Sequence, residues 1–279
     1  MDTKPIAIPN ANKAIWEKGD FTRIAATMRE SGEALVKSLR IGKGMKVLDL
    51  GCGDGTTAIP AAADGADVLG VDIASNLVAA GNARATALKL GNCRFEEGDA
   101  SNLVNIKDKT FDVAVSIFGA MFAPKPFEVA KELVRVTRSG GRIVMGNWIP
   151  GDPTLVAQIL KISSAYSPPP PEGFISPMTW GVEANVVERF ASAGVPAKNI
   201  TCVKDTYMFN YLGSASKFLE QFRNFYGPTM NAFDFATKNG KAAELQNELE
   251  MLFNQQNQAK NNSKTTIPAS FLRVNVNVP

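Results

Sequence analysis

The chain has 279 residues, 45% of them hydrophobic and 20% charged, so it is long enough and apolar enough to bury a sizeable core. Its formal net charge is +3 and it has no basic runs, which argues against a nucleic-acid partner. It contains no histidine, which excludes histidine metal ligands, Ser-His or Cys-His nucleophile pairs and an imidazole base.

The N-terminal region is predicted to be helical. Its first ten residues, MDTKPIAIPN, lack the charged start and apolar core of a signal peptide. In residues 11–40 apolar side chains such as Ile24, Met28 and Leu35 recur at helical spacing, and the helix-stop pattern IGKG follows. We interpret residues 1–40 as a helical segment that precedes the main fold.

Residues 41–150 alternate short β-rich runs with helical stretches. The expected strands are 46–50, 67–71, 93–96, 111–117 and 142–147, and the expected helices are near 56–64, 75–89 and 125–137. Runs such as KVLDL and DVLGV are continuously apolar, which is typical of strands buried on both faces. The alternation predicts βαβ units in a doubly wound, Rossmann-like α/β sheet.

The remaining residues, 151–279, have a different texture. Four consecutive prolines, Pro168 to Pro171, favour a stiff extended loop. Further patterns indicate a helix near 182–192, a strand near 199–209, helices broken at 227–228 and 239–240, and an exposed loop at 254–264. The final run SFLRVNVNV alternates like a half-exposed strand. No linker separates this region, so we assign it as further strands and a helical cap or substrate region within the same domain.

The cysteines and the hydropathy pattern bear on the compartment. Cys52, Cys93 and Cys202 are far apart and form no CxxC pair, so neither a disulfide framework nor a zinc site is predicted. No segment reaches the roughly 18 apolar residues of a membrane span. We expect a cytoplasmic protein with reduced thiols and no membrane partner.

A glycine-rich turn, VLDLGCGDGT at residues 47–56, lies between an expected strand and an expected helix. Such a bare backbone lets a ligand approach the helix N-terminus. The spacing Gly51-x-Gly53-x-Gly55 departs from the G-x-G-x-x-G dinucleotide pattern, because Thr56 stands at the third glycine position, and no P-loop lysine follows. The turn therefore indicates a nucleotide-type ligand other than a typical dinucleotide.

Acidic residues surround the same turn. Asp72 ends the next strand, 72 − 51 = 21 residues after the first glycine, where a carboxylate can accept hydrogen bonds from two ribose hydroxyls. Asp49, Asp54 and Asp99 also fall at strand ends or loops around this crevice. Four carboxylates would repel a pyrophosphate, and they suit a cationic nucleoside.

Five motifs in order, VLDLGCGDGT, GVDIA, EEGDA, FDVAVSIFGAMF and RVTRSGGRIV, resemble those of class I S-adenosylmethionine-dependent methyltransferases over roughly residues 40–150. The chain is most similar to the small-molecule branch that includes the ubiquinone and menaquinone biosynthesis methyltransferases, and IWEKGDF at 15–21 resembles an N-terminal segment of a related subset. Cys52 occupies a variable slot, and Ser139 stands where PGG is commoner than SGG. The resemblance implies a seven-stranded, mostly parallel sheet with an antiparallel last strand and a helical cap, and S-adenosylmethionine as cofactor.

The resemblance implies cofactor contacts from Trp16, Phe21, Asp49, Gly51, Cys52, Gly53, Asp72, Ile73, Asp99, Ala100, Ser116 and Phe118. Gly51 and Gly53 would let the loop approach the methionine part, and Asp49 would order that loop. Asp72 would hold the ribose, and Ile73 would cover the adenine.

Asp99 and Ala100 would lie at the amino edge of the adenine, and Trp16 and Phe21 would close over the cofactor. Each assignment has a structural alternative. Asp72 is also a favourable helix N-cap, Asp99 suits an Asx-turn, and Cys52 suits a small buried filler.

Ser116 and Phe118, after the fourth strand, would face the sulfonium end of the cofactor. We expect Phe118 and Phe122 to contact the substrate, because residues at the carboxyl end of a central strand border the binding crevice of this architecture. Most other aromatic residues of the cap suit core packing equally well. The methyl group would pass in line to an oxygen, nitrogen, sulfur or carbon atom of a small, hydrophobic or aromatic acceptor, and no catalytic side chain is required.

Several questions stay open at this level. Catalytic residues are not identified: Tyr226 or Glu172 could serve as the base for an acidic hydroxyl acceptor, and the pattern does not choose between them. The alternatives are a non-catalytic S-adenosylmethionine-binding protein, a nucleic-acid methyltransferase, disfavoured by SIFG at 116–119, and an NAD(P)-dependent oxidoreductase, disfavoured by the glycine spacing. The oligomeric state is unreadable. The last strand has one polar face, so we expect that side of the sheet to be incompletely covered.

Overall fold

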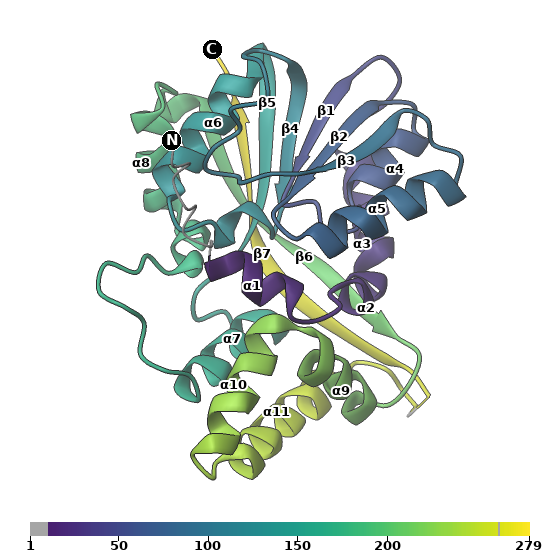
Figure 1. The fold of residues 1–279 in the computed structure, drawn as a ribbon, viewed down its shortest axis with the longest axis vertical. Coiled ribbons are helices and arrows are strands. Elements are labelled where there is room, and N and C mark those ends of the chain that lie inside the picture. The colour runs from purple at the N-terminus through teal and green to yellow at the C-terminus, as the bar shows by residue number, and fades with distance from the viewer. Residues whose placement is uncertain (1–10, 262) are drawn as a thin grey trace, which may run out of the picture.

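The computed structural model describes residues 11–261 and 263–279. The segment 1–10, in which the sequence shows no signal-peptide pattern, lies outside the described residues. A central sheet with helices on both faces forms the upper part of the molecule in Figure 1, and a group of helices lies beneath one end of that sheet.

The sheet has seven strands in the described residues. They are β1 (Lys46–Leu50), β2 (Asp67–Asp72), β3 (Cys93–Glu97), β4 (Phe111–Ile117), β5 (Thr137–Trp148), β6 (Ile200–Tyr211) and β7 (Thr265–Asn277). Their order is β3-β2-β1-β4-β5-β7-β6, and β7 is antiparallel to both of its neighbours while the pairs from β3 to β5 are parallel. The expected doubly wound sheet with an antiparallel last strand is confirmed.

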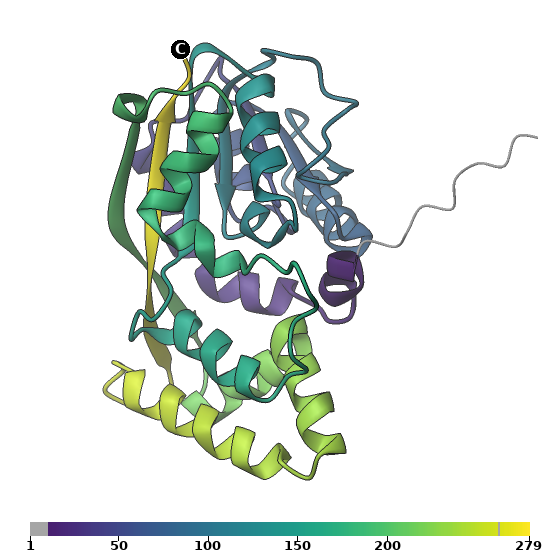
Figure 2. The same ribbon diagram turned by 90° about the vertical axis from the view of Figure 1, so that its left-hand side faces the viewer.

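Helices cover both faces of this sheet. The α-helices are α1 (Ala11–Glu17), α2 (Thr22–Ala25), α3 (Arg29–Ser38), α4 (Ala58–Ala63), α5 (Ser75–Ala87), α6 (Pro126–Val136), α7 (Leu155–Ala165), α8 (Glu183–Ser192), α9 (Ala215–Phe225), α10 (Gly227–Lys238) and α11 (Ala242–Gln256). Short 3-10 helices are η1 (Ala26–Met28), η2 (Ala120–Phe122), η3 (Pro177–Gly181) and η4 (Ala197–Asn199). Figure 2 shows α6 and α8 side by side over one face, and α3, α4 and α5 lie over the other.

The central strands are apolar because both of their faces are covered. Val47 and Leu48 of β1 and Val68 of β2 are fully buried. Burial on two faces explains the continuous apolar runs, since alternation is expected only where one face meets water. The residues at the carboxyl ends of β1 and β2, Asp49 and Asp72 among them, are therefore also buried.

Three boundaries differ from the expected ones. β5 begins at Thr137 rather than near 142, because Gly140 with a φ of 72° lets the chain pass a bulge and pair with β4 on both sides of it. β7 begins at Thr265 rather than near 270, because β6 runs on to Tyr211 and pairs with the added residues. Helix α11 continues to Gln256, three residues into the run expected as loop.

The polar face of β7 is incompletely covered, as expected. Arg273 and Asn275 are half-buried and Asn277 is exposed. Arg273 Nη1 lies 3.2 Å from Asp205 Oδ2 on β6, so a cross-strand ion pair compensates part of the missing cover.

The helical cap consists of α7, α9, α10 and α11. Its core includes Phe218, Phe222 and Phe253, whose ring centroids lie 5.2 to 5.5 Å apart and which are at most 1% exposed. Such edge-to-face clusters combine large apolar burial with favourable ring electrostatics. The cap closes the end of the sheet at which β1, β2 and β4 finish.

Candidate active site

A cavity lies at the carboxyl ends of β1, β2 and β4, with an empty space of about 970 Å³ including its mouth. Eleven of the twelve predicted cofactor residues line it: Trp16, Phe21, Asp49, Gly51, Cys52, Gly53, Asp72, Ile73, Asp99, Ala100 and Phe118. Its position matches the rule that open α/β sheets bind ligands at the carboxyl ends of their strands.

The loop after β1 depends on glycine. Gly51 has a φ of 67° and Gly53 a φ of 54°. A Cβ on Gly51 would lie 2.6 Å from the Cα of Gly119, in the loop after β4. The two loops therefore touch backbone to backbone, and no side chain fits between them.

Ser116 is the predicted site residue that does not line the cavity. Its hydroxyl donates to the Leu50 carbonyl oxygen over 2.6 Å and accepts from the Ala120 amide over 3.0 Å. It joins the loop after β1 to the loop after β4, because a short side chain at a buried strand end has its hydrogen bonds satisfied by backbone. Its place is beneath the cavity rather than in its wall.

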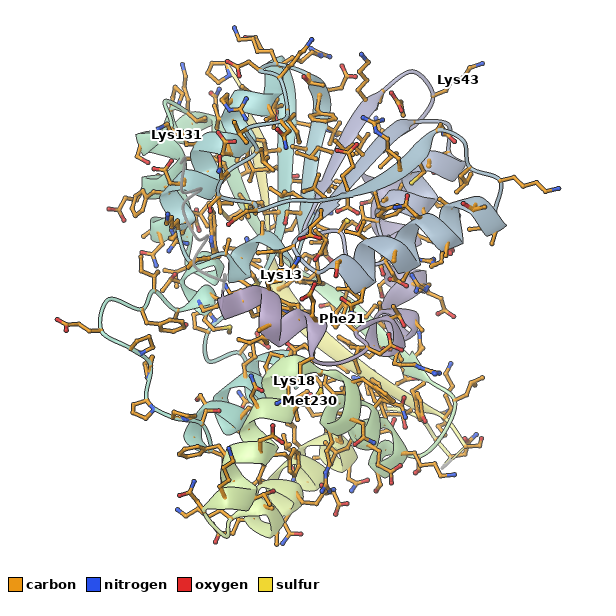
Figure 3. The ribbon with its side chains drawn as sticks, in the orientation of Figure 1. Lys13, Lys18, Phe21, Lys43, Lys131 and Met230 are labelled. Carbon is orange, nitrogen blue, oxygen red and sulfur yellow. The ribbon has the colours of Figure 1, made fainter. Side chains whose placement is uncertain are left out.

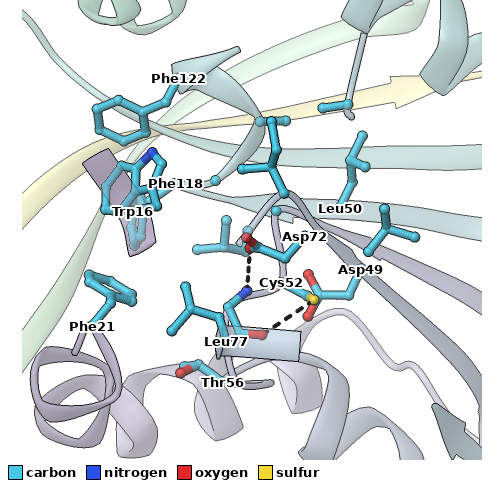
Figure 4. A pocket seen from close by; sticks show the side chains of 18 of the residues that line it. Trp16, Phe21, Asp49, Leu50, Cys52, Thr56, Asp72, Leu77, Phe118 and Phe122 are labelled. Atoms are coloured by element: carbon cyan, nitrogen blue, oxygen red, sulfur yellow. Dashed lines mark hydrogen bonds between the residues drawn. The ribbon is translucent and has the colours of Figure 1, made fainter. Parts of the chain in front are cut away.

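Asp72 organises the glycine loop from the end of β2. Its carboxylate accepts a hydrogen bond from the Gly53 amide over 2.8 Å, drawn as a dashed line in Figure 4, and another from the Ala74 amide over 2.9 Å. Helix α5 begins at Ser75, and the Ser75 amide donates to Glu17 Oε1 of α1 over 3.0 Å. Burial raises the pKa of Asp72, whereas these amide bonds lower it.

Asp49 is a buried acid with an unsatisfied oxygen. It is 2% exposed, and its Oδ2 has no hydrogen-bond partner in the part of the chain that the structure describes. Burial raises the pKa of Asp49 to about 7; a hydrogen bond from the Ala58 amide opposes this rise and the charge of Asp72 adds to it.

Asp54 is balanced by two arginines. Arg29 Nη2 of α3 lies 2.5 Å from Asp54 Oδ2, and Arg84 Nη1 of α5 lies 3.6 Å from the same oxygen. This carboxylate is only 2% exposed, so the pair is screened little by solvent. Of the four acids expected around the crevice, Asp54 thus contributes least negative charge to the cavity.

Asp99 and Ala100 lie in the wall beside Ile73. The Asp99 carboxylate accepts from the Ser101 amide over 2.8 Å and from its hydroxyl over 2.7 Å, which is the Asx-turn geometry considered above. Asp99 therefore forms an Asx-turn and also lines the cavity.

Helix α1 covers the cavity mouth between the sheet and the cap. Lys13 donates to the Ile73 carbonyl and pairs with Glu97, and Lys18 pairs with Asp234 of the cap helix α10. Figure 3 labels Lys13 on α1 and Lys18 between α1 and the cap. In Figure 4 the aromatic rings of Trp16, Phe21 and Phe122 lie on one side of the pocket and Asp49 and Asp72 on the other.

A second space, about 340 Å³ with its opening to solvent included, adjoins the first, and five residues border both; we call it the apolar chamber. The shared residues are Trp16, Phe21, Met28, Phe118 and Phe122; Ile24, Trp148, Val156, Phe209, Phe222 and Tyr226 complete the chamber. Its wall contains no Asp, Glu, Lys or Arg among the described residues.

Phe118 stands at the junction of the two spaces. It has a φ of 64°, which is uncommon for a bulky residue, and its ring stacks on Trp148 at a centroid distance of 3.6 Å. The stack fixes one wall of the apolar chamber. Phe122 also borders both spaces, and its ring centroid lies 4.9 Å from that of Trp16.

The two candidate bases differ in position. Glu172 is exposed in the loop after α7 and borders neither space. Tyr226 borders the apolar chamber, but burial raises its pKa above that of an ordinary tyrosine, which disfavours the phenolate. Of the two candidate bases, only Tyr226 borders the apolar chamber, and its hydroxyl is expected to be neutral there.

The structure adds wall residues that the sequence did not indicate, among them Met28, Thr57, Leu77 and Tyr207. Tyr207 lies on β6, far along the chain from the glycine loop, and no spacing rule points to it. Met28 lies in the helical approach, where its apolar pattern indicated core packing.

Within residues 11–261 and 263–279, no helix is long and apolar enough to cross a membrane, and no three His, Cys, Asp or Glu residues are arranged to hold a metal ion.

The model of a family described as a methyltransferase domain matches residues 41–167. An uncharacterized protein of Mycobacterium tuberculosis is 33% identical over 225 residues, which cover 80% of this chain and 79% of that protein. A demethylmenaquinone methyltransferase of Paenarthrobacter aurescens is 33% identical over 114 residues, 41% of this chain and 43% of that enzyme. A Haemonchus contortus phosphoethanolamine N-methyltransferase, solved with phosphomonomethylethanolamine and S-adenosylhomocysteine, has a similar fold: TM-score 0.56, 16% identity, covering 90% of this chain and 53% of that one.

The fold and these similarities define a methyltransferase with a doubly wound α/β sheet, and the cavity lies where such sheets bind their ligands. The chain belongs to the class I S-adenosylmethionine-dependent methyltransferases. Methyltransferases of this class use S-adenosylmethionine as cofactor and a methyl acceptor as second substrate. The unpaired oxygen of Asp49 and the bare backbone at Gly51 and Gly53 fit a ligand that carries both positive charge and hydrogen-bond donors.

Proposed function

We propose that the protein methylates a small, hydrophobic or aromatic acceptor that occupies the apolar chamber beside the cofactor cavity. The observation that carries this proposal is the pair of adjoining spaces, one acidic and glycine-lined, the other walled by aromatic and aliphatic side chains. A charged acceptor would lose its hydration in this chamber and find no counter-ion on its wall.

We propose cofactor roles that follow the same geometry. Asp72 holds the ribose, Ile73 and Ala100 border the adenine, and the loop at Gly51 and Gly53 borders the methionine part. Support comes from their positions in one cavity wall and from the buried carboxylate of Asp72, which keeps lone pairs beyond its two amide bonds. Ser116 positions the two loops and does not touch the ligand.

In this mechanism the protein holds the acceptor and the methyl group in line and excludes water from the site, and it supplies no reactive side chain. S-adenosylmethionine supplies a methyl group on a sulfonium that is already a good leaving group. Phe118 and Phe122 orient the acceptor at the junction of the two spaces, and helix α1 with Trp16 and Phe21 closes the mouth. Holding two reactants in line is worth up to roughly 7–11 kcal/mol in favourable systems.

The test is an acceptor screen with methyl-labelled S-adenosylmethionine. The panel pairs each neutral aromatic compound bearing a hydroxyl, thiol, amine or acidic carbon with a charged analogue of the same ring, and it includes DNA and RNA. The proposal requires transfer to neutral aromatic members. Transfer confined to nucleic acid or to the charged members would refute it.

Filling the apolar chamber should stop methyl transfer without affecting the cofactor. Val156 is 3% exposed and borders the chamber but not the cofactor cavity. Val156→Phe is expected to lower kcat/KM for any acceptor found by at least about tenfold, because the added ring occupies acceptor space. Calorimetry should give the wild-type affinity for S-adenosylhomocysteine.

The matched control is Val134→Phe, a partly buried position on α6 that borders neither space. Equal losses in the two variants, or an unchanged Val156→Phe enzyme, would place the acceptor elsewhere.

The affinity for S-adenosylmethionine should rise with pH. Asp49 is faced by Asp72 of β2, Cys52 of the glycine loop and Tyr207 of β6, and its pKa is raised to about 7. Below this value the group is mostly neutral, and above it a carboxylate attracts the cationic cofactor. Affinity at pH 8 is expected to be about tenfold higher than at pH 6.

Titration calorimetry at the two pH values measures this difference. Asp49→Asn removes the ionisable group and should flatten the profile. A steep profile that persists in that variant would assign the titration to another group.

A further inference from the structure

Tyr226 brings a hydroxyl to the wall of the apolar chamber. The residue lies between α9 and α10, is 4% exposed and borders the chamber but not the cofactor cavity. Its hydroxyl makes no hydrogen bond to the described residues, and it is not among the polar atoms that are fully enclosed. Buried polar groups are nearly always paired, so this hydroxyl calls for a partner in the molecule that occupies the chamber.

The ring of Tyr226 is fixed by its neighbours. Its centroid lies 5.4 Å from that of Phe222 and 5.9 Å from that of Trp16, both in edge-to-face contact. The Tyr226 amide donates to the Phe222 carbonyl over 3.0 Å, and its carbonyl accepts from the Met230 amide over 2.9 Å. The hydroxyl therefore stays at the wall, since swinging the ring would break two aromatic contacts.

The wall of the chamber offers hydrogen-bond donors and no charge. Its side-chain N–H and O–H groups belong, among the described residues, to Trp16, Trp148 and Tyr226. An indole N–H can only donate, and burial raises the pKa of Tyr226, so its hydroxyl keeps its proton and can donate as well. A neutral oxygen with free lone pairs complements such a wall, whereas an ammonium group would find no carboxylate there.

Tyr226 also stands apart from the place of methyl transfer. In the proposed function the methyl group passes at the junction of the two spaces, which Phe118 and Phe122 border. Tyr226 borders only the chamber. The group that meets its hydroxyl is therefore a second polar group of the acceptor and not the atom that receives the methyl group.

We propose that Tyr226 donates a hydrogen bond to a carbonyl oxygen of the acceptor, which is a neutral aromatic compound with its carbonyl group away from the methylated atom. Tyr226 is thus a specificity-determining residue and not a base. This inference rests on the proposed function, because it takes the acceptor to occupy the apolar chamber.

The experiment compares acetophenone with ethylbenzene, in which a methylene group replaces the carbonyl. Ligand-observed NMR titrations measure both dissociation constants on the complex with S-adenosylhomocysteine, for wild type and for Tyr226→Phe. The preference for acetophenone over ethylbenzene is expected to fall about fivefold in the variant, because one neutral hydrogen bond is lost from the ketone alone. The cost of taking the ketone out of water is the same in both proteins and cancels in this comparison.

Two measurements separate a hydrogen bond from a packing effect. Tyr226→Phe keeps the ring and should bind ethylbenzene at least as tightly as wild type does, since it removes an unpaired hydroxyl. Tyr211→Phe is the matched control. Tyr211 stacks on Phe218 and borders neither space, so the loss of its hydroxyl should leave the preference at the wild-type value.

Two results would overturn the role of Tyr226 and leave the proposed function standing. They are the same preference in wild type and Tyr226→Phe, and an equal loss of affinity for both probes, which would assign Tyr226 to packing alone. A wild-type complex with S-adenosylhomocysteine that binds neither probe would instead overturn the proposed function and this inference with it.

Discussion

Replacing Asp72 with alanine is expected to weaken binding of S-adenosylhomocysteine by at least about a hundredfold, since the two charge-assisted hydrogen bonds that we propose between Asp72 and ribose are worth roughly 1.5–3 kcal/mol each. The same carboxylate holds the Gly53 and Ala74 amides, so the variant also frees the glycine loop. Titration calorimetry gives the loss directly.

Asp67→Ala provides the control for this prediction. Asp67 begins the same strand, is exposed and lies at the opposite end of the strand from the cavity. Its replacement should leave the affinity unchanged. If Asp72→Ala binds as wild type does, the ribose site is elsewhere in the cavity.

Gly51→Ala is expected to lower the free energy of unfolding and to abolish cofactor binding. A left-handed backbone costs a residue with a Cβ about 1–2 kcal/mol, and here the Cβ also meets the Gly119 backbone at 2.6 Å. Because neither loop can yield without breaking the Ser116 bonds, we expect a total loss of about 3 kcal/mol or more, measured by urea unfolding.

Gly44→Ala separates the cost of a left-handed backbone from the cost of the steric clash with Gly119. Gly44 also has a left-handed backbone, with a φ of 85°, but a Cβ there meets nothing within 4 Å. Its variant should lose only the strain energy and bind the cofactor normally. Similar stabilities for the two variants would mean that the contact between the loops is not tight in solution.

The sheet and most of the cofactor cavity were predictable from sequence because their signals are local. The strand, glycine turn and helix at 46–63 are contiguous, and Asp72 follows at a spacing fixed by one βαβ unit. Bulges and strand ends were less predictable: the fifth strand was expected to begin near 142, whereas Gly140 carries a bulge within β5, which begins at Thr137.

The apolar chamber and Tyr207 were beyond sequence reasoning because distant segments meet there. The chamber combines Trp148 of β5, Val156 of α7 and Phe222 of α9 with residues near the N-terminus, and each of these has an apolar pattern that packing alone explains. For Ser116 the sequence predicted a ligand contact from its motif position. Instead, its hydroxyl makes hydrogen bonds to the backbone of Leu50 and Ala120 and does not line the cavity.

The shared wall of the two spaces has a thermodynamic consequence. Five residues, among them Trp16, Phe118 and Phe122, border both the cofactor cavity and the apolar chamber, so a ligand that orders them in one space changes the free energy of binding in the other. Linkage makes this coupling reciprocal: the factor by which S-adenosylhomocysteine changes the affinity for an acceptor equals the factor by which the acceptor changes the affinity for S-adenosylhomocysteine. With the acceptor in the apolar chamber, as proposed, these shared side chains set the cooperativity between the two substrates.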